Sequence, residues 1–409
     1  MAQMRHNYDI VIVGGGASGI LAAIFARRNG ATVLLCEKMP RLGKKILASG
    51  SGRCNLLNDK IDASFYNPEA CKIADSVLAQ FTKQKALEFF KYLGLVVYSD
   101  EGRIFPVTNQ AQSVLEVLEI ELSSLGVDVR CLSQVHSISA APVGFTLRLN
   151  PGERILSGKL ILCCGGRSYP ALGADGSGYA LAAGFGHTII DPVPSTVPLL
   201  THDPFCHLLQ GLKISVSVYS LIHDKTGRKV KGDLLFTKYG LSGTAILDIS
   251  EEISIAINRL GGKDVEIIVD LLPFLTEEEL IKELTIRLER KFPNDRLLAG
   301  LLPHKLSAVF LGFFKTRDAA MIAKQLKNKK FVIYGTRGWN EAEFTSGGVD
   351  TSEVNSRSLE SKLCPGLYFA GEVLNVQGRR GGYNLAWAWA SGFVAGSSAA
   401  QVAKNHMEG

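Results

Sequence analysis

A glycine-rich turn near the start of this chain of 409 residues limits its fold more than any other feature. Gly14, Gly16 and Gly19 satisfy the pattern G-x-G-x-x-G. The turn follows residues 9–13, an apolar run typical of a buried strand, and precedes residues 20–29, whose apolar residues repeat at helical spacing. Glycines in this context let the backbone approach a pyrophosphate at the positive end of the helix. The sequence therefore predicts a dinucleotide-binding β-α-β unit.

Glu37 supports this prediction and narrows the choice of dinucleotide. It follows the next apolar run, residues 32–36, at a place where a carboxylate accepts hydrogen bonds from ribose hydroxyls. A 2′-phosphate at the same position would bring two negative charges together without a cation between them. The turn is therefore expected to bind FAD or NAD, and not NADP.

Composition and charge favour a cytoplasmic enzyme that acts on a small molecule. The hydrophobic content of 46% is ordinary for a globular protein, and the length predicts two or three domains. The net charge of +6, without a strong basic block, is too small to favour nucleic acid. The 8 cysteines and 8 histidines show no metal-ligand spacing, so we expect no metal and a reducing compartment.

The sequence predicts neither export nor a membrane span. Residues 1–7 lead directly into a strand pattern and contain no signal-peptide core. Residues 383–403 carry no charge and are long enough to cross a bilayer, but Asn384, Ser391 and Gln401 are poorly suited to lipid. We expect a buried helix of a soluble protein in this segment.

Changes of pattern divide the chain into an α/β domain and an insertion. Residues 214–222 and 266–271 alternate as antiparallel strands do, whereas residues 277–291 and 305–326 have helical patterns. Residues 366–371 resemble the last strand of a doubly wound sheet. We expect an α/β fold with a discontinuous Rossmann-type domain over residues 1–190 and 340–409, an inserted antiparallel β domain over 191–272 with a strand return near 331–339, and a helical subdomain over 273–330.

Further motifs go beyond a generic dinucleotide fold. The run Pro-Arg-Leu-Gly-Lys-Lys-Ile-Leu-Ala-Ser-Gly-Ser-Gly-Arg-Cys-Asn ends at Asn55. It resembles the corresponding run of the BaiN-like flavoprotein family, which includes proteins called aminoacetone oxidases. Other matching segments are residues 165–170, 173–178, 234–243, 345–349 and 366–392, so the resemblance extends from residue 9 to about residue 396.

The resemblance implies a glutathione-reductase-like FAD domain with an inserted β-barrel-like domain and a small helical domain. It implies that the glycine turn contacts the pyrophosphate, that Glu37 contacts the ribose, and that residues 49–55 pass along the flavin. It also implies FAD contacts at the start of the last helix. The candidate cofactor-binding residues are Gly14, Gly16, Ala17, Ser18, Gly19, Glu37, Lys38, Lys44, Ser49, Gly50, Gly52, Arg53, Cys54, Asn55, Val135, Gly165, Gly166, Gly371, Glu372, Gly382, Tyr383 and Asn384.

Two positions depart from the family pattern. Ser51 stands where the family usually has glycine. Residues 375–381 read Asn-Val-Gln-Gly-Arg-Arg-Gly, where many relatives have an acidic residue and a threonine. Because guanidinium groups hold carboxylates or phosphates in bidentate geometry, two arginines here alter the expected substrate choice. The candidate catalytic residues are Arg53, Arg379, Arg380 and Tyr383, and the alternative is that they are solvated or simply packed side chains.

The chemistry expected is an FAD-dependent oxidoreduction of a small organic molecule. A nicotinamide donor is implied by the resemblance, but no second G-x-G-x-x-G follows a strand, so NAD(P)H would dock transiently. Two alternatives stay open: an oxygen-dependent oxidase of a small amine such as aminoacetone, and a flavin-containing RNA-modifying or nucleic-acid-binding protein. Cys54, Cys163 and Cys164 are expected to be structural. The sequence does not name the substrate or the oligomeric state.

Overall fold

The computed structural model describes residues 7–142, 144–150, 152–313 and 316–405. The chain forms two compact units, which we describe separately. The first contains the residues up to Pro192 together with those from Phe344 onward. The second contains Val193–Glu343. The second unit is therefore an insertion into the first.

The first unit is built on a 7-stranded sheet with the order β6-β2-β1-β9-β8-β7, in which β20 also pairs with β9. Strands β6, β2, β1, β9 and β20 run parallel to one another, whereas β8 is antiparallel to both of its neighbours, β7 and β9. Val13 lies opposite both Cys36 and Leu162, so three parallel strands end at the same edge. The strands are β1 (Asn7–Val13), β2 (Val33–Cys36), β6 (Asp128–Arg130), β7 (Val135–Ala140), β8 (Phe145–Leu149), β9 (Glu153–Leu162) and β20 (Leu367–Phe369).

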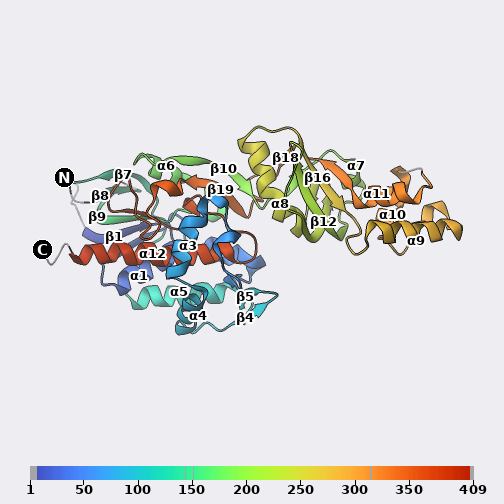
Figure 1. Ribbon diagram of the computed structural model, residues 1–409. Coiled ribbons are helices and arrows are strands. Elements are labelled where there is room, and N and C mark those ends of the chain that lie inside the picture. The colour runs from blue at the N-terminus through green and yellow to red at the C-terminus, as the bar shows by residue number, and fades with distance from the viewer. Residues whose placement is uncertain (1–6, 143, 151, 314–315, 406–409) are drawn as a thin grey trace. The chain divides into compact units, whose positions relative to one another are not determined.

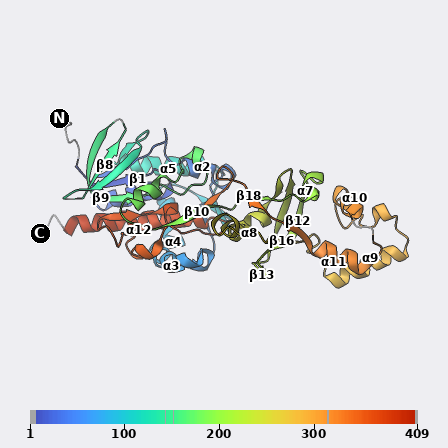
Figure 2. The same ribbon diagram turned by 90° about the horizontal axis from the view of Figure 1, so that it is seen from above.

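Helix α12 (Tyr383–Asn405) packs along this sheet and against α1 (Ala17–Arg28). Figure 1 shows α12 and α1 beneath strands β1, β8 and β9. In Figure 2 the strands lie on one side of α12, while α3 (Cys71–Gln80) and α4 (Lys83–Tyr92) lie on the other. The remaining elements of this unit are α2 (Lys44–Ala48), β3 (Leu57–Asn58), β4 (Val97–Asp100), β5 (Arg103–Pro106), α5 (Ala111–Ser124), α6 (Ser177–Ala183), β10 (Ile189–Ser195) and β19 (Phe344–Val349).

The interior of the first unit explains why residues 383–403 carry no charge. Trp387 and Trp389 of α12 are fully buried, and their indole N–H groups donate to the backbone oxygens of Gly371 and Leu56, both at 3.1 Å. The helix is thus apolar because it is covered by protein on several sides. Among the described helices, none has the length and hydropathy that crossing a membrane requires.

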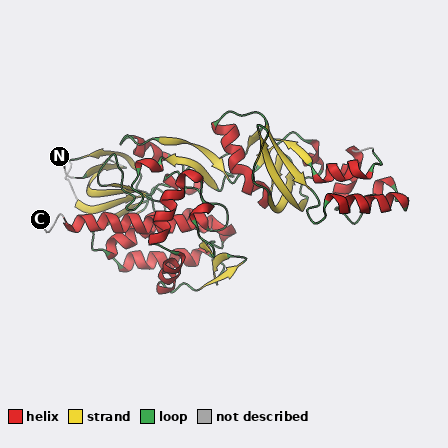
Figure 3. Ribbon diagram, in the orientation of Figure 1, coloured by secondary structure: helices red, strands yellow, loops and turns green. Residues whose placement is uncertain are grey.

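The second unit has an 8-stranded sheet with the order β17-β16-β12-β14-β15-β11-β18, and β13 pairs with β12. Figure 3 shows helices α9, α10 and α11 gathered at one end of this sheet. The strands are β11 (Leu199–Leu200), β12 (Lys213–Ile222), β13 (Lys225–Thr226), β14 (Val230–Thr237), β15 (Gly240–Ser242), β16 (Val265–Asp270), β17 (Lys329–Val332) and β18 (Gly335–Thr336). The helices are α7 (Pro204–Leu208), α8 (Thr244–Ser254), α9 (Glu277–Glu289), α10 (His304–Phe313) and α11 (Ala319–Lys327).

The resemblance implied a β-barrel-like inserted domain, and among the described residues no closed barrel is found. Strands β17 and β18 stand at opposite ends of the strand order, and no backbone ladder joins them among the described residues. Only residues 333 and 334 separate β17, which pairs with β16, from β18, which pairs with β11. The N–H of Ile333 donates to the oxygen of Val265 at 2.9 Å, and the N–H of Tyr334 donates to that of Leu200 at 3.1 Å. The expected capping box is present at α9, where Thr276 and Glu279 bond to each other's backbone N–H groups.

The contact between α1 and α12 depends on small residues. A Cβ atom added at Gly392 would lie 2.3 Å from the carbonyl oxygen of Ser18, and one added at Gly396 would lie 2.3 Å from that of Ala22. Neither oxygen belongs to a flexible side chain that could move away. The two helices therefore approach each other more closely than any larger residue would allow.

We predict that Gly396→Ala destabilises the first unit by about 1–3 kcal/mol, because the added methyl group forces α1 and α12 apart. Urea unfolding monitored by tryptophan fluorescence measures this change. Gly312→Ala is the control, since it adds the same group to α10 where no atom lies within 4 Å. Equal stability of both variants would contradict the proposed packing constraint.

Candidate functional site

The glycine turn lines a pocket at the carboxyl ends of β1, β2 and β9. Gly14 and Gly19 are required by packing, since added Cβ atoms would lie 2.4 Å from the oxygen of Cys163 and 1.8 Å from that of Gly14. Gly16 differs, because a Cβ atom there would meet no atom within 4 Å. The turn thus presents exposed backbone at the start of α1, which is the arrangement that a pyrophosphate needs.

Glu37 is fixed on the wall of the same pocket. Its Oε2 accepts a hydrogen bond of 2.6 Å from the N–H of Gly15, and its Oε1 accepts one of 2.8 Å from the N–H of Met39. The carboxylate therefore connects the glycine turn to the end of β2. Each oxygen retains a further lone pair, which leaves capacity for ribose hydroxyls.

Several other predicted residues line this pocket. Lys38 pairs with Asp175 at 2.7 Å, and Lys44 Nζ donates to the oxygen of Ala171 at 3.2 Å. Burial raises the pKa of Asp175, but the hydrogen bonds from Lys38 and Ser177 outweigh burial and lower that pKa to about 2. The predicted cofactor-binding residues that line the pocket are Gly14, Gly16, Glu37, Lys38, Lys44, Val135 and Gly165.

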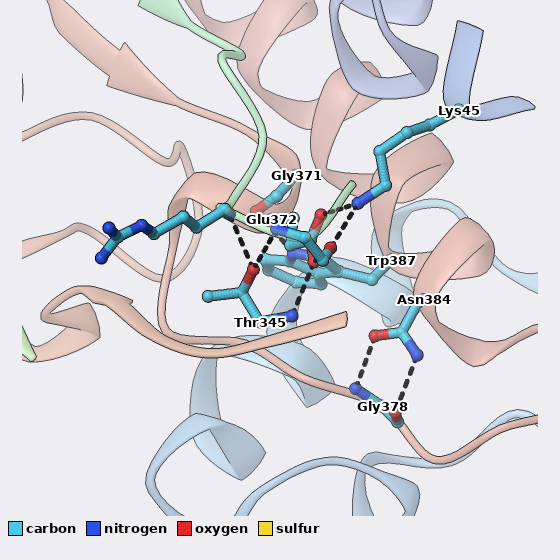
Figure 4. Close-up of polar contacts among 9 residues, drawn as sticks. Lys45, Thr345, Gly371, Glu372, Gly378, Asn384 and Trp387 are labelled. Atoms are coloured by element: carbon cyan, nitrogen blue, oxygen red, sulfur yellow. Dashed lines mark hydrogen bonds and ion pairs between the residues drawn. The ribbon is translucent and has the colours of Figure 1, made fainter. Parts of the chain in front are cut away.

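An ion pair that the sequence did not reveal lies between α2 and the end of β20. Lys45 Nζ lies 2.6 Å from Glu372 Oε2 and donates to Ser168 Oγ at 2.8 Å, as Figure 4 shows for the pair. Glu372 Oε1 accepts from the N–H of Thr345 at 2.9 Å. Lys45 also lines the pocket. The partners are remote in sequence, so no local pattern could have identified Lys45.

Gly371 and Gly166 are positioned beside this ion pair. The N–H of Gly371 donates to Ser391 Oγ at 2.9 Å, and its oxygen accepts from Trp387. Its φ of 79° favours glycine, and an added Cβ would lie 2.4 Å from Ser18 Oγ. An added Cβ at Gly166 would lie 2.3 Å from Thr345 Oγ1. Both glycines therefore permit close packing around Glu372.

The predicted flavin loop, residues 49–55, adopts an unusual backbone. Gly50, Ser51, Gly52 and Cys54 all have positive φ angles, between 57° and 85°. This geometry explains why the family usually has glycine where this chain has Ser51, whose φ is 57°. The side-chain NH2 of Asn55 donates to the backbone oxygen of Leu57 at 2.9 Å, and its side-chain oxygen accepts from the N–H of Gly382 at 3.1 Å. The loop is thus fastened to the start of α12.

A stack of aromatic and cationic groups borders the start of α12. Tyr383 stacks on Phe65 with ring centres 4.5 Å apart, and the Arg379 guanidinium lies 5.3 Å from the centre of the Phe65 ring. Asn384 holds the preceding turn by accepting from the N–H of Gly378 at 2.9 Å and donating to its oxygen at 2.7 Å (Figure 4). Sequence reasoning missed Phe65, because nothing local marks it as a partner of Tyr383.

Other candidate residues have different surroundings. Arg53 lies over the ring of Phe105, 4.3 Å from its centre, and Arg380 is half-buried. Burial raises the pKa of Cys54 to about 12 and that of Cys164 to about 12, so both thiols are protonated at neutral pH. Within the described part of the chain, no group of three or more His, Cys, Asp or Glu side chains is placed to hold a metal ion.

Comparison with known proteins places these features in a family context. The family described as "HI0933-like protein Rossmann domain" matches residues 8–398. A 3-dehydro-bile acid delta(4,6)-reductase from Clostridium scindens is 38% identical, over 96% of this chain and 99% of that protein. A ribosomal RNA dihydrouridine synthase from Escherichia coli is 35% identical, over 95% of this chain and 97% of that protein.

Solved structures support the fold. A flavocytochrome c3 fumarate reductase superposes with a TM-score of 0.55 and 16% identity, covering 98% of this chain and 79% of that one. Sdh1 of Mycobacterium smegmatis superposes with a TM-score of 0.52 and 16% identity, covering 98% and 70% of the two chains. At this level of identity the likeness establishes a shared fold only.

We predict that Glu37→Gln weakens FAD binding by about 10–100-fold, because a charged hydrogen-bond acceptor contributes about 1.5–3 kcal/mol. Titration of the apoprotein with FAD, followed by quenching of flavin fluorescence, gives the Kd. Glu116→Gln on the exposed face of α5 is the matched control and should leave the Kd unchanged. A Glu37→Gln variant that binds as tightly as the control would show that the carboxylate makes no cofactor contact.

Proposed function

The chain belongs to the HI0933-like Rossmann family of FAD-binding oxidoreductases, and on that basis we propose that it saturates a carbon–carbon double bond conjugated with a carbonyl group. The observation that carries this proposal is similarity over nearly the whole length of two named relatives. The names describe a reductase of a delta(4,6) 3-dehydro-bile acid and a dihydrouridine synthase. A 3-oxo compound of this kind and the uracil ring both contain a double bond conjugated with a carbonyl.

The residues of the pocket fit FAD. Open space at Gly16 and the start of α1 suit the pyrophosphate, while Glu37 suits the adenosine ribose. The Lys45–Glu372 pair and the loop of residues 49–55 suit the remainder of the cofactor. When bound, FAD supplies the two-electron hydride chemistry, so the protein itself must bind, orient and protonate the substrate.

Saturation of a conjugated double bond also requires a proton at the carbon next to the carbonyl. We assign its delivery to the phenol of Tyr383, whose ring is held by Phe65. Burial raises the pKa of Tyr383, an effect that the charge of Arg379 partly offsets, so the phenol is protonated at neutral pH. Arg379 and Arg380 would stabilise negative charge that develops on the carbonyl oxygen.

The electron donor in this proposal is NAD(P)H, which docks transiently. Only one glycine turn of the dinucleotide type follows a strand in this sequence, and the pocket beside Glu37 suits FAD. A second dinucleotide must therefore bind elsewhere and leave after each turnover. NAD(P)H and the carbonyl-containing substrate would therefore bind and react one after the other in each turnover.

A uracil base within ribosomal RNA is a second candidate substrate. It is favoured by the 35% identity to the ribosomal RNA dihydrouridine synthase across nearly both chains. The net charge of +6 led us to expect no nucleic-acid partner. Net charge alone does not exclude RNA as a substrate when the chain is 35% identical to an enzyme named for modifying RNA. The bond to be reduced is of the same chemical class in both candidates.

The proposed reaction is tested by anaerobic spectroscopy of the FAD-loaded protein. We expect NADH or NADPH to bleach the absorbance near 450 nm, and a 3-oxo-Δ4,6 steroid acid to restore it with formation of the saturated product. Unmodified ribosomal RNA replaces the steroid in a parallel reaction. Bleaching by a small amine and not by NAD(P)H would contradict the proposal and support an amine oxidase.

We predict that Tyr383→Phe slows substrate saturation by about 10²–10⁴-fold, because it removes the proton donor. The rate at which NAD(P)H bleaches the flavin should stay within a factor of about two, since that half-reaction needs no proton from this phenol. Stopped-flow absorbance separates the two half-reactions. Tyr92→Phe, at an exposed position of α4, is the control. Equal slowing of both half-reactions would mean that Tyr383 acts on cofactor binding instead.

A further inference from the structure

A second cleft in the first unit lies apart from the glycine turn. It has a volume of about 710 Å³ and is bounded by the start of α3 and by the chain that follows β19, two elements labelled in Figure 1. A volume within the range of about 300–1,000 Å³ is typical of clefts that hold small ligands. None of its lining residues lines the pocket beside Glu37.

The charges lining this cleft are unbalanced. Lys72, Arg357 and Lys362 all line it, and among the described contacts none of the three forms an ion pair with a carboxylate. The two carboxylates of the cleft accept hydrogen bonds from neutral groups, which orient them and leave their charge in place. Asp350 accepts from the N–H of Ser352 at 2.8 Å, and Glu69 accepts from the amide of Asn67 at 3.2 Å. Three cationic side chains against two carboxylates leave the cleft with one excess positive charge. Lys362 Nζ donates to the oxygen of Ser352 at 2.7 Å, so Lys72 and Arg357 are the cations that a ligand would meet.

Uncharged hydrogen-bonding groups accompany these cations. Thr351, Ser352 and Ser356 also line the cleft. Lysine and arginine together with hydroxyl groups and backbone N–H groups are the ligands that proteins use for phosphate oxygens. Scattered cations on a convex surface would be solvated and would need no explanation, but these line a concave site. Their combination indicates recognition of phosphate.

Asn67 connects the cleft to the proposed active site. Besides bonding Glu69, it accepts from the N–H of Gln377 at 2.9 Å, donates its own N–H to the oxygen of Gln377 at 3.0 Å, and donates its amide to the oxygen of Asn375 at 3.3 Å. The segment so fixed leads directly to Arg379 and to the start of α12. A ligand held by its phosphates in the cleft is thus anchored beside the segment that borders Tyr383.

We propose that this cleft binds the phosphate groups of the nicotinamide dinucleotide that serves as electron donor. The inference rests on the proposed function, which requires a second dinucleotide and offers it no second glycine turn. A dinucleotide carries a pyrophosphate some distance from its reacting ring, so its phosphates need their own anchor. Lys72 and Arg357 provide the charge, and the hydroxyl groups provide orientation.

The test compares Lys72→Ala and Arg357→Ala with Lys91→Ala, an exposed lysine of α4 that lies outside the cleft. Lys72 and Arg357 are both exposed, so their replacement leaves the core intact. For the FAD-loaded protein under anaerobic conditions, we expect each cleft variant to raise the Kd for NADPH by about tenfold. The limiting rate of flavin reduction should stay within a factor of about two, and the control should match the wild type.

Calorimetric titration with ADP and with inorganic pyrophosphate gives a readout that does not depend on turnover. Binding should weaken in the cleft variants and should weaken further as salt rises, because the interaction is ionic. An unchanged Kd for NADPH in both variants, with normal flavin reduction, would overturn the assignment of the cleft while leaving the donor in place. Pyrophosphate binding that depends on Lys72, in a protein whose flavin NADPH does not reduce, would overturn the donor itself.

Discussion

The parallel pairing of β1 with β2 and β9 is the constraint on which the candidate site depends. Because Val13 lies opposite both Cys36 and Leu162, the glycine turn, Glu37 and the residues after β9 are delivered to one edge of the sheet. The hydrogen bond from Gly15 to Glu37 then joins two of these ends directly. A shift of register by one residue would separate the turn from the carboxylate and would also move buried side chains to the wrong face.

The parts of the site that the sequence predicted are those encoded over short distances. The turn from Gly14 to Gly19 and the carboxylate of Glu37 belong to one β-α-β unit, whose spacing is set by local geometry. The buried helix near the C-terminus was predicted from an uncharged segment that contains polar residues unsuited to lipid, and the buried indoles of Trp387 and Trp389 explain why charge is absent. For the turn and Glu37 the physical cause is local, whereas the burial of α12 depends on distant segments and only its apolar composition is local.

The parts that the sequence did not predict depend on contacts between distant segments. Lys45 forms an ion pair with Glu372, and Phe65 stacks on Tyr383. Asn67 hydrogen-bonds the backbone of Gln377. No local periodicity encodes pairs so distant in sequence. A β-barrel-like domain was expected from family resemblance, and no closed barrel is found among the described residues: β11 and β18 have only two residues each, and β18 does not pair with β17. The role of each candidate cofactor residue stays a prediction that the binding measurements address.

The discontinuity of the first unit has a consequence for how the protein matures. The ribosome delivers the glycine turn and Glu37 early, but Glu372 and α12 emerge only after the whole insertion has been made. Glu372 follows Glu37 by 335 positions, so at synthesis rates of roughly 5–20 residues per second the delay is about 17–67 seconds. During that interval α12 and β20 are missing, so the surfaces of α1 and β9 that they cover stay exposed. The candidate site would then be complete only after α12 has been synthesised.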